Sequence, residues 1–579
     1  MAPPVKSSIW TFFIRCDLGG QCKLCKQNVK TKGNTTNLKN HLKRHHKNTY
    51  SDLNKSGESS TTAVSEIELK LTNALLYFIT VDDLPLNATE KRGFQHLMKT
   101  VCPTYSVPSR NTITRLIDEK YENISNVIKA QLMQVHSFCL TTDVWTDTMN
   151  TRSYLGLTCH FLHNNCLKSI VIAIKDLDER HSAEYLKQVI ESLCSEWNIN
   201  EQKILAIVTD NGANNVKAIH ELLGKNKHLP CFAHTLNLVV QKAVEETRGF
   251  DALVNKVKTI VTFFKHSVSA QDELTKLQKS NNVLPKKLVM DVITRWNSKL
   301  FMLQRFIELC DFVSTILLQN PKAPAMLGGN EIAIIKEIIN VLTPIENVTK
   351  EISGQDYVTS SIIIPIIFCM TKSIESANTG SASEVSDLGA EFKAKILSET
   401  NKRFKNIEKV HLLAISTILD PRFKKIYFTD AQSCAKSLND ITDSLKTTDA
   451  NKNTTENAQN VALPDDEDNI WKFHSQLVSE SNLNIPKEGL DDILKQYLRE
   501  PLLARQADPI TYWTSRSSIW PGLSCLALKY LTIVATSVPS ERLFSLAGNT
   551  LTDSRNRLDP VRLSKLLFLK SLNAESWNL

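Results

Sequence analysis

The chain has 579 residues, several times the length of a typical domain of about 100–200 residues, so we expect more than one domain. A composition of 42% hydrophobic and 22% charged residues excludes a chain that is disordered throughout. The net charge of +8 is unevenly distributed, because residues 1–50 carry +9 and the remainder carries −1. A positive field on one small module suits a polyanionic partner, and a solvated lysine-rich tail is the alternative.

Neither a secreted protein nor a membrane protein is expected. The 13 cysteines show no repeating framework, and the N-terminus lacks the apolar core of a signal peptide, so we expect a reducing compartment. The longest apolar run, around Ile362–Met370, contains Pro365 and is far shorter than the roughly 20 residues that cross a bilayer. We therefore expect no membrane partner.

The basic N-terminal segment contains a set of candidate metal ligands. Cys22-Lys-Leu-Cys25 is followed after fifteen residues by His41, and two further histidines stand at His45 and His46. Two thiolates and two imidazoles form a closed tetrahedral Zn²⁺ site, and a module of about fifty residues needs such a staple because its own core is small. Both later histidines can reach back one helical turn towards His41, and we take His46 as the fourth ligand.

A short helix is expected to carry the histidine ligands. It should begin around Asn34–Leu38, with Thr36 or Asn37 as its cap, and turn His41 inward. Basic side chains of this segment could neutralise DNA phosphates. The candidate DNA contacts are Lys39, Lys43 and Arg44.

The order of these features resembles the BED-type zinc finger, a family that binds DNA. Trp10, Phe12 and Phe13 precede the cysteine pair, and the stretch N-T-T-N-L-x-x-H-L with a last histidine follows it. The resemblance implies a ββα zinc finger over residues 1–50 that binds double-stranded DNA. The gap between Trp10 and Cys22 is short, which would trim the hairpin.

A linker and a helical region are expected next. Residues 51–65 are polar and rich in Ser and Thr, which predicts a flexible linker. Helical periodicity over residues 66–135, interrupted by one turn-rich stretch, predicts a small helical domain. This domain could serve helical packing alone, or it could be an accessory DNA-binding domain through Lys99, Arg110 and Arg115.

Residues 136–246 show the pattern β-β-β-α-β-α, which predicts an α/β domain. The expected elements are, in order, strands at Phe138–Val144, Tyr154–His160 and Ser169–Ile174, a helix at Ala183–Trp197, a strand at Ile204–Val208 and a helix from about Cys231.

Three acidic residues could form a second metal site. Asp143 ends the first strand and Asp210 ends the fourth, and carboxylates at the edges of adjacent strands can share metal ions. Glu541, in the first turn of a helix capped by Ser537 or Ser540, would complete a catalytic site for two Mg²⁺ or Mn²⁺ ions about 3.5–4 Å apart. Each acid also has a structural explanation, since strand ends favour turns and a helix start favours negative charge.

Motifs along essentially the whole chain resemble the hAT (hobo/Activator) superfamily of DNA transposases. They are T-T-D-x-W-T at Asp143, T-D-N-G-A-N-N at Asp210, C-F-A-H-T-L-N-L-V at Cys231–Val239, T-R-W-N-S at Thr294–Ser298 and S-V-P-S-E-R-x-F-S at Ser537–Ser545. The resemblance implies a multidomain α+β protein whose RNase H-like α/β core is interrupted by a large all-α insertion. It also implies that Asp143, Asp210 and Glu541 are the catalytic D-D-E triad.

The 331 positions from Asp210 to Glu541 are too many for an uninterrupted core. We expect a helical insertion over residues 247–510, with residues 431–469 disordered because they are polar and poor in aromatics, and the end of the core at residues 511–579. Helical periodicity in the insertion occurs at Val254–Phe264, Lys299–Leu317 and Ile332–Ile345.

The resemblance suggests further roles. In hAT enzymes the tryptophan matching Trp296 is associated with stacking on a base at the transposon end, so Trp296 and Arg295 are candidate DNA-binding residues, with core packing as the alternative for Trp296. Cys231 and His234 are too few ligands for a metal site, and we expect the thiol in the core and the imidazole at the edge of the active site. The apolar helix at Leu563–Leu572 matches a region that mediates dimerisation in relatives, which implies a homodimer or higher oligomer; a buried core helix is the competing interpretation.

Two functions follow from these expectations. The first is a zinc-dependent nuclear DNA-binding protein that acts as a dimer and, as a DDE-type transposase, cleaves and joins DNA at transposon ends. The second is a domesticated, transposase-derived transcription regulator, or a SUMO-ligase-like protein, without nuclease activity. The three acids do not decide between them, because an unselected relic keeps its acids for a time.

Overall fold

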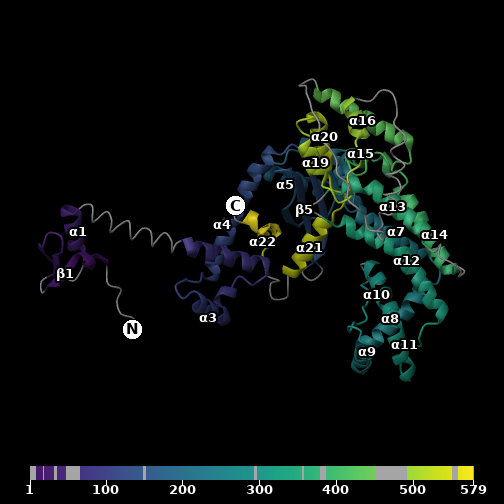
Figure 1. The fold of residues 1–579 in the computed structure, drawn as a ribbon, viewed down its shortest axis with the longest axis horizontal. Coiled ribbons are helices and arrows are strands. Elements are labelled where there is room, and N and C mark those ends of the chain that lie inside the picture. The colour runs from purple at the N-terminus through teal and green to yellow at the C-terminus, as the bar shows by residue number, and fades with distance from the viewer. Residues whose placement is uncertain are drawn as a thin grey trace. The chain divides into compact units, whose positions relative to one another are not determined.

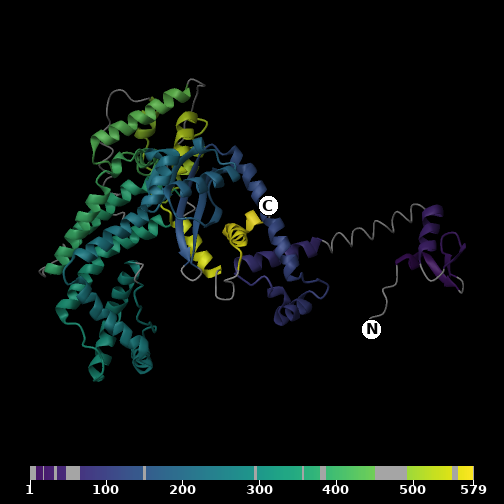
Figure 2. The same cartoon turned by 180° about the vertical axis from the view of Figure 1, so that it is seen from behind.

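The computed structural model describes residues 8–16, 19–31, 35–46, 66–147, 151–292, 296–354, 358–377, 386–449, 492–550 and 558–577. The chain divides into two compact units, Met1–Lys120 and Tyr121–Leu579, drawn from two sides in Figures 1 and 2. Within these described ranges, none of the helices has both the length and the apolar character that a bilayer span requires.

The N-terminal finger is built from short elements. They are η1 (Ser8–Phe12), β1 (Phe13–Cys16), β2 (Gly19–Cys22), β3 (Asn28–Lys30) and α1 (Thr36–His45). The strands form one antiparallel sheet in the order β1-β2-β3, so the expected ββα pattern lacks one strand. The third strand forms because the turn after Cys22, closed by a bond from its N–H to the Gln27 carbonyl (2.9 Å), leads the chain back along β2.

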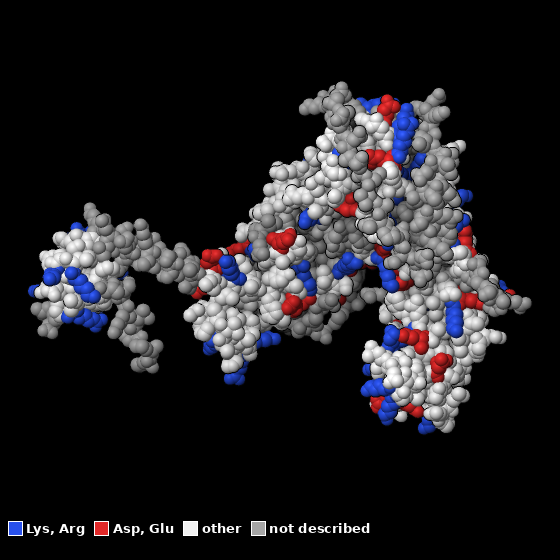
Figure 3. Space-filling view, viewed as in Figure 1, with Lys and Arg blue, Asp and Glu red and all other residues white. Residues whose placement is uncertain are grey.

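The finger has a small core and a basic surface. The core consists of Ile9, Phe13, Cys22, Leu38 and Leu42, all buried. Figure 3 shows basic side chains on the finger and no acidic side chain among its described residues on this face. The finger therefore presents positive charge outward, as its composition predicts.

Helix α1 begins differently from the expectation. The N-cap position belongs to Thr35, without a side-chain bond, so neither Thr36 nor Asn37 is the cap. Asn37 instead donates from Nδ2 to the Lys30 carbonyl (2.9 Å) and so links α1 to the end of β3.

The remainder of the first unit is helical. It comprises a helix at residues 66–81, η2 (Ala88–Glu90), α3 (Arg92–Val101) and the first half of α4 (Arg110–Gln134). The Arg110 N–H donates to Glu90 Oε1 (2.8 Å), which fixes the start of α4 against η2. Helix α4 continues into the second unit.

A five-stranded mixed sheet forms the centre of the second unit. Its strands are β4 (Phe138–Asp147), β5 (Arg152–His163), β6 (Cys166–Leu177), β7 (Ile204–Thr209) and β8 (His228–Pro230), in the order β6-β5-β4-β7-β8. Strands β4, β7 and β8 are parallel to their neighbours in this group, whereas β5 is antiparallel to both β4 and β6. The helices that follow the strands are α5 (Ala183–Glu196), α6 (Ala213–Leu223) and α7 (Phe232–Glu246).

Two of these elements were absent from the sequence prediction. Helix α6 begins inside the T-D-N-G-A-N-N run, whose residue types favour turns, and so its start was hidden. Strand β8 has only three residues and includes Pro230, which an edge strand tolerates because one side of it needs no N–H donor.

A large helical region follows the sheet. Its helices are α8 (Phe250–His266), α9 (Val268–Ser280), α10 (Trp296–Glu308), α11 (Cys310–Gln319), α12 (Gly329–Ile352), α13 (Ile363–Ser376), α14 (Asp387–Phe404), α15 (His411–Ile418), α16 (Ala431–Asp449), α18 (Asp492–Arg499), α19 (Pro509–Ser515) and α20 (Pro521–Leu531). Figures 1 and 2 show α8–α11 gathered at one end of this region and α15, α16, α19 and α20 at the other. The stretch expected as one helix at Lys299–Leu317 is two helices that meet at Leu309.

The expected disorder at residues 431–469 is wrong for its first part. Helix α16 buries Leu438, Ile441 and Leu445, which stand three and four residues apart and form one apolar stripe. The polar composition of this stretch belongs to the outer face of the helix. Residues 450–469 lie outside the described part of the chain.

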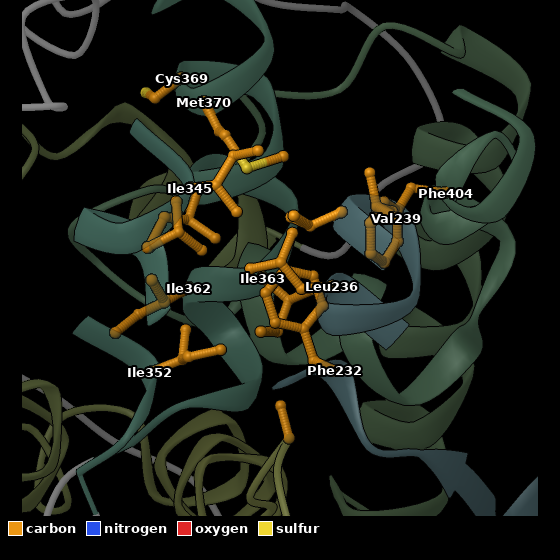
Figure 4. Close-up of a cluster of buried hydrophobic side chains, with 14 of the residues drawn as sticks. Phe232, Leu236, Val239, Ile345, Ile352, Ile362, Ile363, Cys369, Met370 and Phe404 are labelled. Carbon is orange, nitrogen blue, oxygen red and sulfur yellow. The ribbon is translucent and has the colours of Figure 1, made fainter. Parts of the chain in front are cut away.

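The helical region and the sheet share one hydrophobic core. Figure 4 shows Phe232 and Leu236 of α7 beside Ile363 and Phe404, which come from α13 and α14. All four side chains belong to one cluster of buried residues. The helical region therefore packs as part of the second unit, and it is not tethered to the sheet by linkers alone.

The C-terminal helices close the second unit. They are α21 (Val538–Thr550), α22 (Pro560–Ser571) and α23 (Ala574–Trp577). Helix α22 packs on β6, and its apolar residues Leu563, Leu566, Leu567, Phe568 and Leu569 are all buried within the chain. The interpretation of a buried core helix therefore describes the apolar side of α22, and a role of this region in dimerisation is compatible with it.

Replacing Leu567 by Ala should destabilise the second unit by about 2–4 kcal/mol, because it leaves a cavity where a side chain with no exposed surface now packs. Val561→Ala, on the same helix but 63% exposed, is the matched control and should change stability by less than about 0.5 kcal/mol. Scanning calorimetry of the two variants tests this. Equal melting temperatures would show that α22 is not held against the sheet.

Candidate zinc site and candidate carboxylate site

Four side chains of the finger converge as a metal-ligand group. The ligand atoms of Cys22, Cys25, His41 and His46 all lie within 4.8 Å of one another. Cys25 Sγ is 3.2 Å from His41 Nε2, and Cys22 Sγ is 3.6 Å from His46 Nε2. Tetrahedral zinc has ligand distances of about 2.3 Å to sulfur and about 2.0 Å to nitrogen, which sets neighbouring ligand atoms roughly 3.3–3.8 Å apart. The donor set and its spacing therefore fit a zinc ion.

The structure separates the two histidines that the sequence left as alternatives. His46 is the C-cap of α1, where its N–H bonds to the Leu42 carbonyl (2.8 Å), and its ring turns back to the cysteines. His45 is exposed, and its ring lies 4.9 Å from that of His41 without joining the ligand group. Burial, followed by the neighbouring His45 and His46, lowers the pKa of His41, which favours the neutral imidazole that binds zinc.

The candidate DNA contacts of the finger lie on the outer face of α1. Lys39, Lys43 and Arg44 are exposed, whereas Leu38 and His41 of the same helix are buried. The basic face is thus held by the zinc ligands and the small core behind it, so the charges keep a fixed spacing.

The second site brings together residues far apart in sequence. Asp143 lies inside β4, which continues to Asp147 in its pairing with β5, so the expectation that Asp143 ends this strand is wrong. Asp210 directly follows β7 as expected, and β4 and β7 are parallel with Thr142 paired to Thr209. Glu541 lies in the first turn of α21, which packs on β4 and β5. Parallel pairing therefore sets the two aspartates side by side, and α21 brings in the third acid.

The three acids interact electrostatically. The pKa of Asp143 is raised to about 7: burial is the largest cause, the charges of Asp210 and Glu541 add to the rise, and a bond from the Val144 N–H opposes it. Among the described residues, the finger ligands are the compact metal-ligand group. The three acids are near enough for their charges to act on one another.

Short-range contacts orient Asp210. Its Oδ1 accepts bonds from the Gly212 N–H (3.2 Å) and from Asn215 Nδ2 (2.9 Å). A Cβ on Gly212 would lie 3.1 Å from Asp210 Oδ1, so a larger residue would crowd the carboxylate. The T-D-N-G-A-N-N motif thus serves to aim one acid, because its glycine and its asparagine both hold the same oxygen.

Apolar contacts set the position of α21. Phe544 stacks on Trp145 (ring centroids 5.9 Å apart) and fills the space over Gly156, where an added Cβ would lie 2.9 Å from the Phe544 ring. Gly156 is paired with Asp143 across β4 and β5. Sequence reasoning missed Gly156, for which a glycine inside a strand is the only signal.

A buried polar row lies beneath the acids. His160 Nε2 is 3.3 Å from Thr141 Oγ1, which is 3.0 Å from Ser540 Oγ, so β5, β4 and α21 are joined side by side. Complete burial lowers the pKa of His160 to about 3, so its ring stays neutral. Helix α21 begins at Val538, which leaves Ser537 in front of the helix and excludes Ser540 as its cap.

The two remaining candidate DNA-binding residues are Trp296 and Arg295. Trp296 opens α10 and is half-buried against the large hydrophobic cluster, as its packing alternative requires. Arg295 lies outside the described residues.

Sequence reasoning also missed His228. Its Nε2 is 2.9 Å from Thr209 Oγ1, beside Asp210. Burial and the neighbouring His220 lower the pKa of His228 to about 4.

Comparisons with protein families match four parts of the chain. The matches are a BED zinc finger at residues 7–47, a ZBED1 RNase-like domain at 141–233, a ZBED1 RNase-like helical domain at 229–341 and an hAT family C-terminal dimerisation region at 493–572. They cover the finger, the five-stranded sheet, much of the helical region and the C-terminal helices.

Similar proteins include some named as zinc finger BED domain-containing proteins and some named as transposases. Human zinc finger BED domain-containing protein 4 is 25% identical over 86% of this chain and 43% of its own length. The putative AC9 transposase of Zea mays is 25% identical over 86% of this chain and 65% of its own length. The Hobo transposase of Drosophila melanogaster is 24% identical over 93% of this chain and 88% of its own. The chain thus spans less than two thirds of the first two relatives.

Removing His46 should release zinc from the finger, because three ligands leave the site open, whereas removing His45 should not. We expect His46→Ala to lower zinc affinity by at least about 10-fold and His45→Ala to retain it, measured by competition with a chromophoric chelator. Equal retention in both variants would mean that the two histidines exchange as ligands.

Neutralising Asp143 should stabilise the second unit in a pH-dependent way. The raised pKa of Asp143 means that its contribution to stability is complete below its ordinary pKa of 3.8 and is lost as the pH rises through about 7. Asp143→Asn should therefore be more stable than wild type at pH 8, by roughly 1–3 kcal/mol in free energy of unfolding, with the gap closing towards pH 4.

Calorimetry of zinc-loaded protein without added Mg²⁺ or Mn²⁺ measures this gap. Asp272→Asn, on the exposed surface of α9, controls for the loss of one negative charge. A gap that is constant across the pH range would show that Asp143 is ionised at little cost in the folded protein.

Proposed function

The chain is a BED-type zinc finger protein of the hAT transposase superfamily, and from this we propose that it is a nuclear protein that binds double-stranded DNA as a dimer. The finger would hold zinc through Cys22, Cys25, His41 and His46. The conclusion rests on the finger, because its four ligand atoms already fit the ion and its outer face is basic.

The finger is proposed to dock on DNA through α1. Lys39, Lys43 and Arg44 would contact phosphates, which gives affinity that falls with salt. Trp296 and Arg295 would contact a base or the backbone of the DNA. In a dimer the two fingers would bind together and so raise affinity without new contacts.

We further propose that the sheet and α21 form an RNase H-like core in two parts, at residues 136–246 and 511–579, interrupted by the helical insertion at residues 247–510. The strand order β6-β5-β4-β7-β8 with β5 antiparallel supports this assignment. The insertion does not disturb the sheet, because the chain leaves after α7 and its last part returns to pack α21 on β4 and β5.

Nuclease activity is the more specific proposal. Asp143, Asp210 and Glu541 would hold two Mg²⁺ or Mn²⁺ ions, since carboxylate oxygens are the ligands these cations prefer and the raised pKa of Asp143 reflects negative charge that cations would offset. Bound ions would activate water or a 3′-hydroxyl and stabilise charge on the scissile phosphate. Asn215 would keep the Asp210 carboxylate oriented towards the ions. The contact between Thr141 and Ser540 would fix the position of α21, which carries Glu541, against β4.

A second function is a DNA-binding regulator without nuclease activity. The observation that favours it is that the finger, whose four ligand atoms form a compact group, belongs to a different compact unit of the chain from the three acids. In that case the finger and the dimer would be retained while the carboxylate site served only the fold.

Cleavage of the chain's own terminal inverted repeats in Mn²⁺ distinguishes the two functions. Asp210→Ala should reduce cleavage by about 100-fold or more, because it removes a ligand shared by the cations, while DNA affinity through the finger should be unchanged. Asp272→Ala is the control for charge. Cleavage that does not depend on Asp210 would exclude the nuclease and leave the regulator.

A further inference from the structure

The segment that leads into α21 is held without charged groups. Residues 532–537 are buried, and they run beside the start of α7 at the edge of the candidate carboxylate site. Because Glu541 stands only one helical turn further on, any shift of this segment moves its carboxylate. The bonds that fix the segment therefore bear on the geometry of the site.

Three of the hydrogen bonds of this segment join it to Thr359 and to the start of α7. The Ala535 N–H donates to Thr359 Oγ1 (3.0 Å), and the Ala535 carbonyl accepts from the Phe232 N–H (3.0 Å). The third bond is made by a thiol, since the Ser537 N–H donates to Cys231 Sγ (3.3 Å). The first two bonds fix the middle of the segment, and the thiol fixes the residue immediately before α21.

Cys231 is also joined to the strand that leads to Asp210. Its backbone N–H donates to the Thr209 carbonyl (2.8 Å), and its Sγ accepts from the His234 N–H (3.5 Å) as the N-cap of α7. One residue thus connects the end of β7, the start of α7 and the start of α21. These are the elements that position Asp210 and Glu541.

The chemistry of sulfur suits this place. The Cys231 side chain is completely buried, and burial raises the pKa of its thiol, with the negative charge of Glu541 adding to the rise. The thiol therefore stays neutral and adds no fourth negative charge beside the three acids. Sulfur also accepts N–H bonds at 3.3–3.5 Å here, distances at which a hydroxyl oxygen on the same Cβ would fall short.

We propose that Cys231 is a positioning residue, whose sulfur holds the start of α21 at the distance from the end of β7 that lets Glu541 join Asp143 and Asp210. This rests on the proposed function for the role of the three acids, whereas the tether itself stands on the contacts above. If Cys231 only filled space in the core, its replacement by Ala would alter neither the exchange of the Ser537 amide nor the affinity of the three acids for a cation.

The test compares three variants of the full, zinc-loaded chain. Cys231→Ala removes the acceptor, Cys231→Ser keeps an acceptor of shorter reach, and Cys194→Ala removes an equally buried thiol from α5 that makes none of these bonds. Calorimetry first measures the loss of stability in each variant. Amide exchange and Mn²⁺ affinity can then be compared between variants that lose a similar amount of stability.

Hydrogen exchange at the Ser537 amide reports the tether directly. Loss of the bond should speed exchange there by about 10-fold in Cys231→Ala, with a smaller change in Cys231→Ser and none in Cys194→Ala. Equal exchange in Cys231→Ala and Cys194→Ala would overturn the proposal.

Mn²⁺ binding, followed by electron paramagnetic resonance, reports the position of Glu541. The dissociation constant for Mn²⁺ should rise by about 10-fold in Cys231→Ala, recover in part in Cys231→Ser and stay at the wild-type value in Cys194→Ala. An unchanged affinity in Cys231→Ala would overturn the positioning role. If wild type binds no Mn²⁺, the nuclease proposal fails together with this role, and the amide exchange decides whether the tether exists.

Discussion

The partly buried group of three carboxylates is the constraint on which the second unit depends. Asp143, Asp210 and Glu541 come from three separate elements, and burial of Asp143, followed by the charges of the other two acids, raises its pKa to about 7. Like charges in a partly buried site disfavour the folded state, so packing elsewhere must offset them. That packing is the fit of Phe544 into the space over Gly156. The row of polar contacts from His160 through Thr141 to Ser540, which joins β5, β4 and α21, supports it.

The helical insertion contributes to this arrangement because it shares the core of the sheet. Two residues of the insertion bond to the chain around α21. At the end of α12, the Ser353 carbonyl accepts from Arg542 Nη2 (2.6 Å), and further along, Thr359 Oγ1 accepts from the Ala535 N–H. Glu541 lies between these two contacts. A displacement of the end of α12 would therefore act on the residue next to the third acid through the bond between Ser353 and Arg542.

Local features were predictable from the sequence, and long-range features were not. The finger ligands follow from spacing within one segment, and the strands at Phe138–Val144 and Ile204–Val208 follow from apolar runs, so the proximity of Asp143 and Asp210 could be foreseen. Glu541 could be joined to them only through the family resemblance, because 331 residues separate it from Asp210 and no periodicity encodes that contact.

The errors have physical reasons of the same kind. Composition suggested disorder at Ala431, where three buried side chains stabilise a helix. Gly156 escaped notice because it acts by leaving room for a ring. Cys231 was expected in the core, but the two N–H groups that its sulfur accepts could not be foreseen. Such roles depend on tertiary contacts, and residue type alone does not indicate them.

The central claim is that α21 and the two strand ends form one cation site. The most direct test is a crystal structure of the zinc-loaded chain soaked in Mn²⁺, with anomalous scattering recorded at wavelengths that distinguish manganese from zinc. The account predicts manganese between Asp143 and Asp210, with Glu541 moved in as a ligand, and zinc only in the finger. Manganese bound at the two aspartates while Glu541 keeps its distance, or no manganese at these acids, would contradict it.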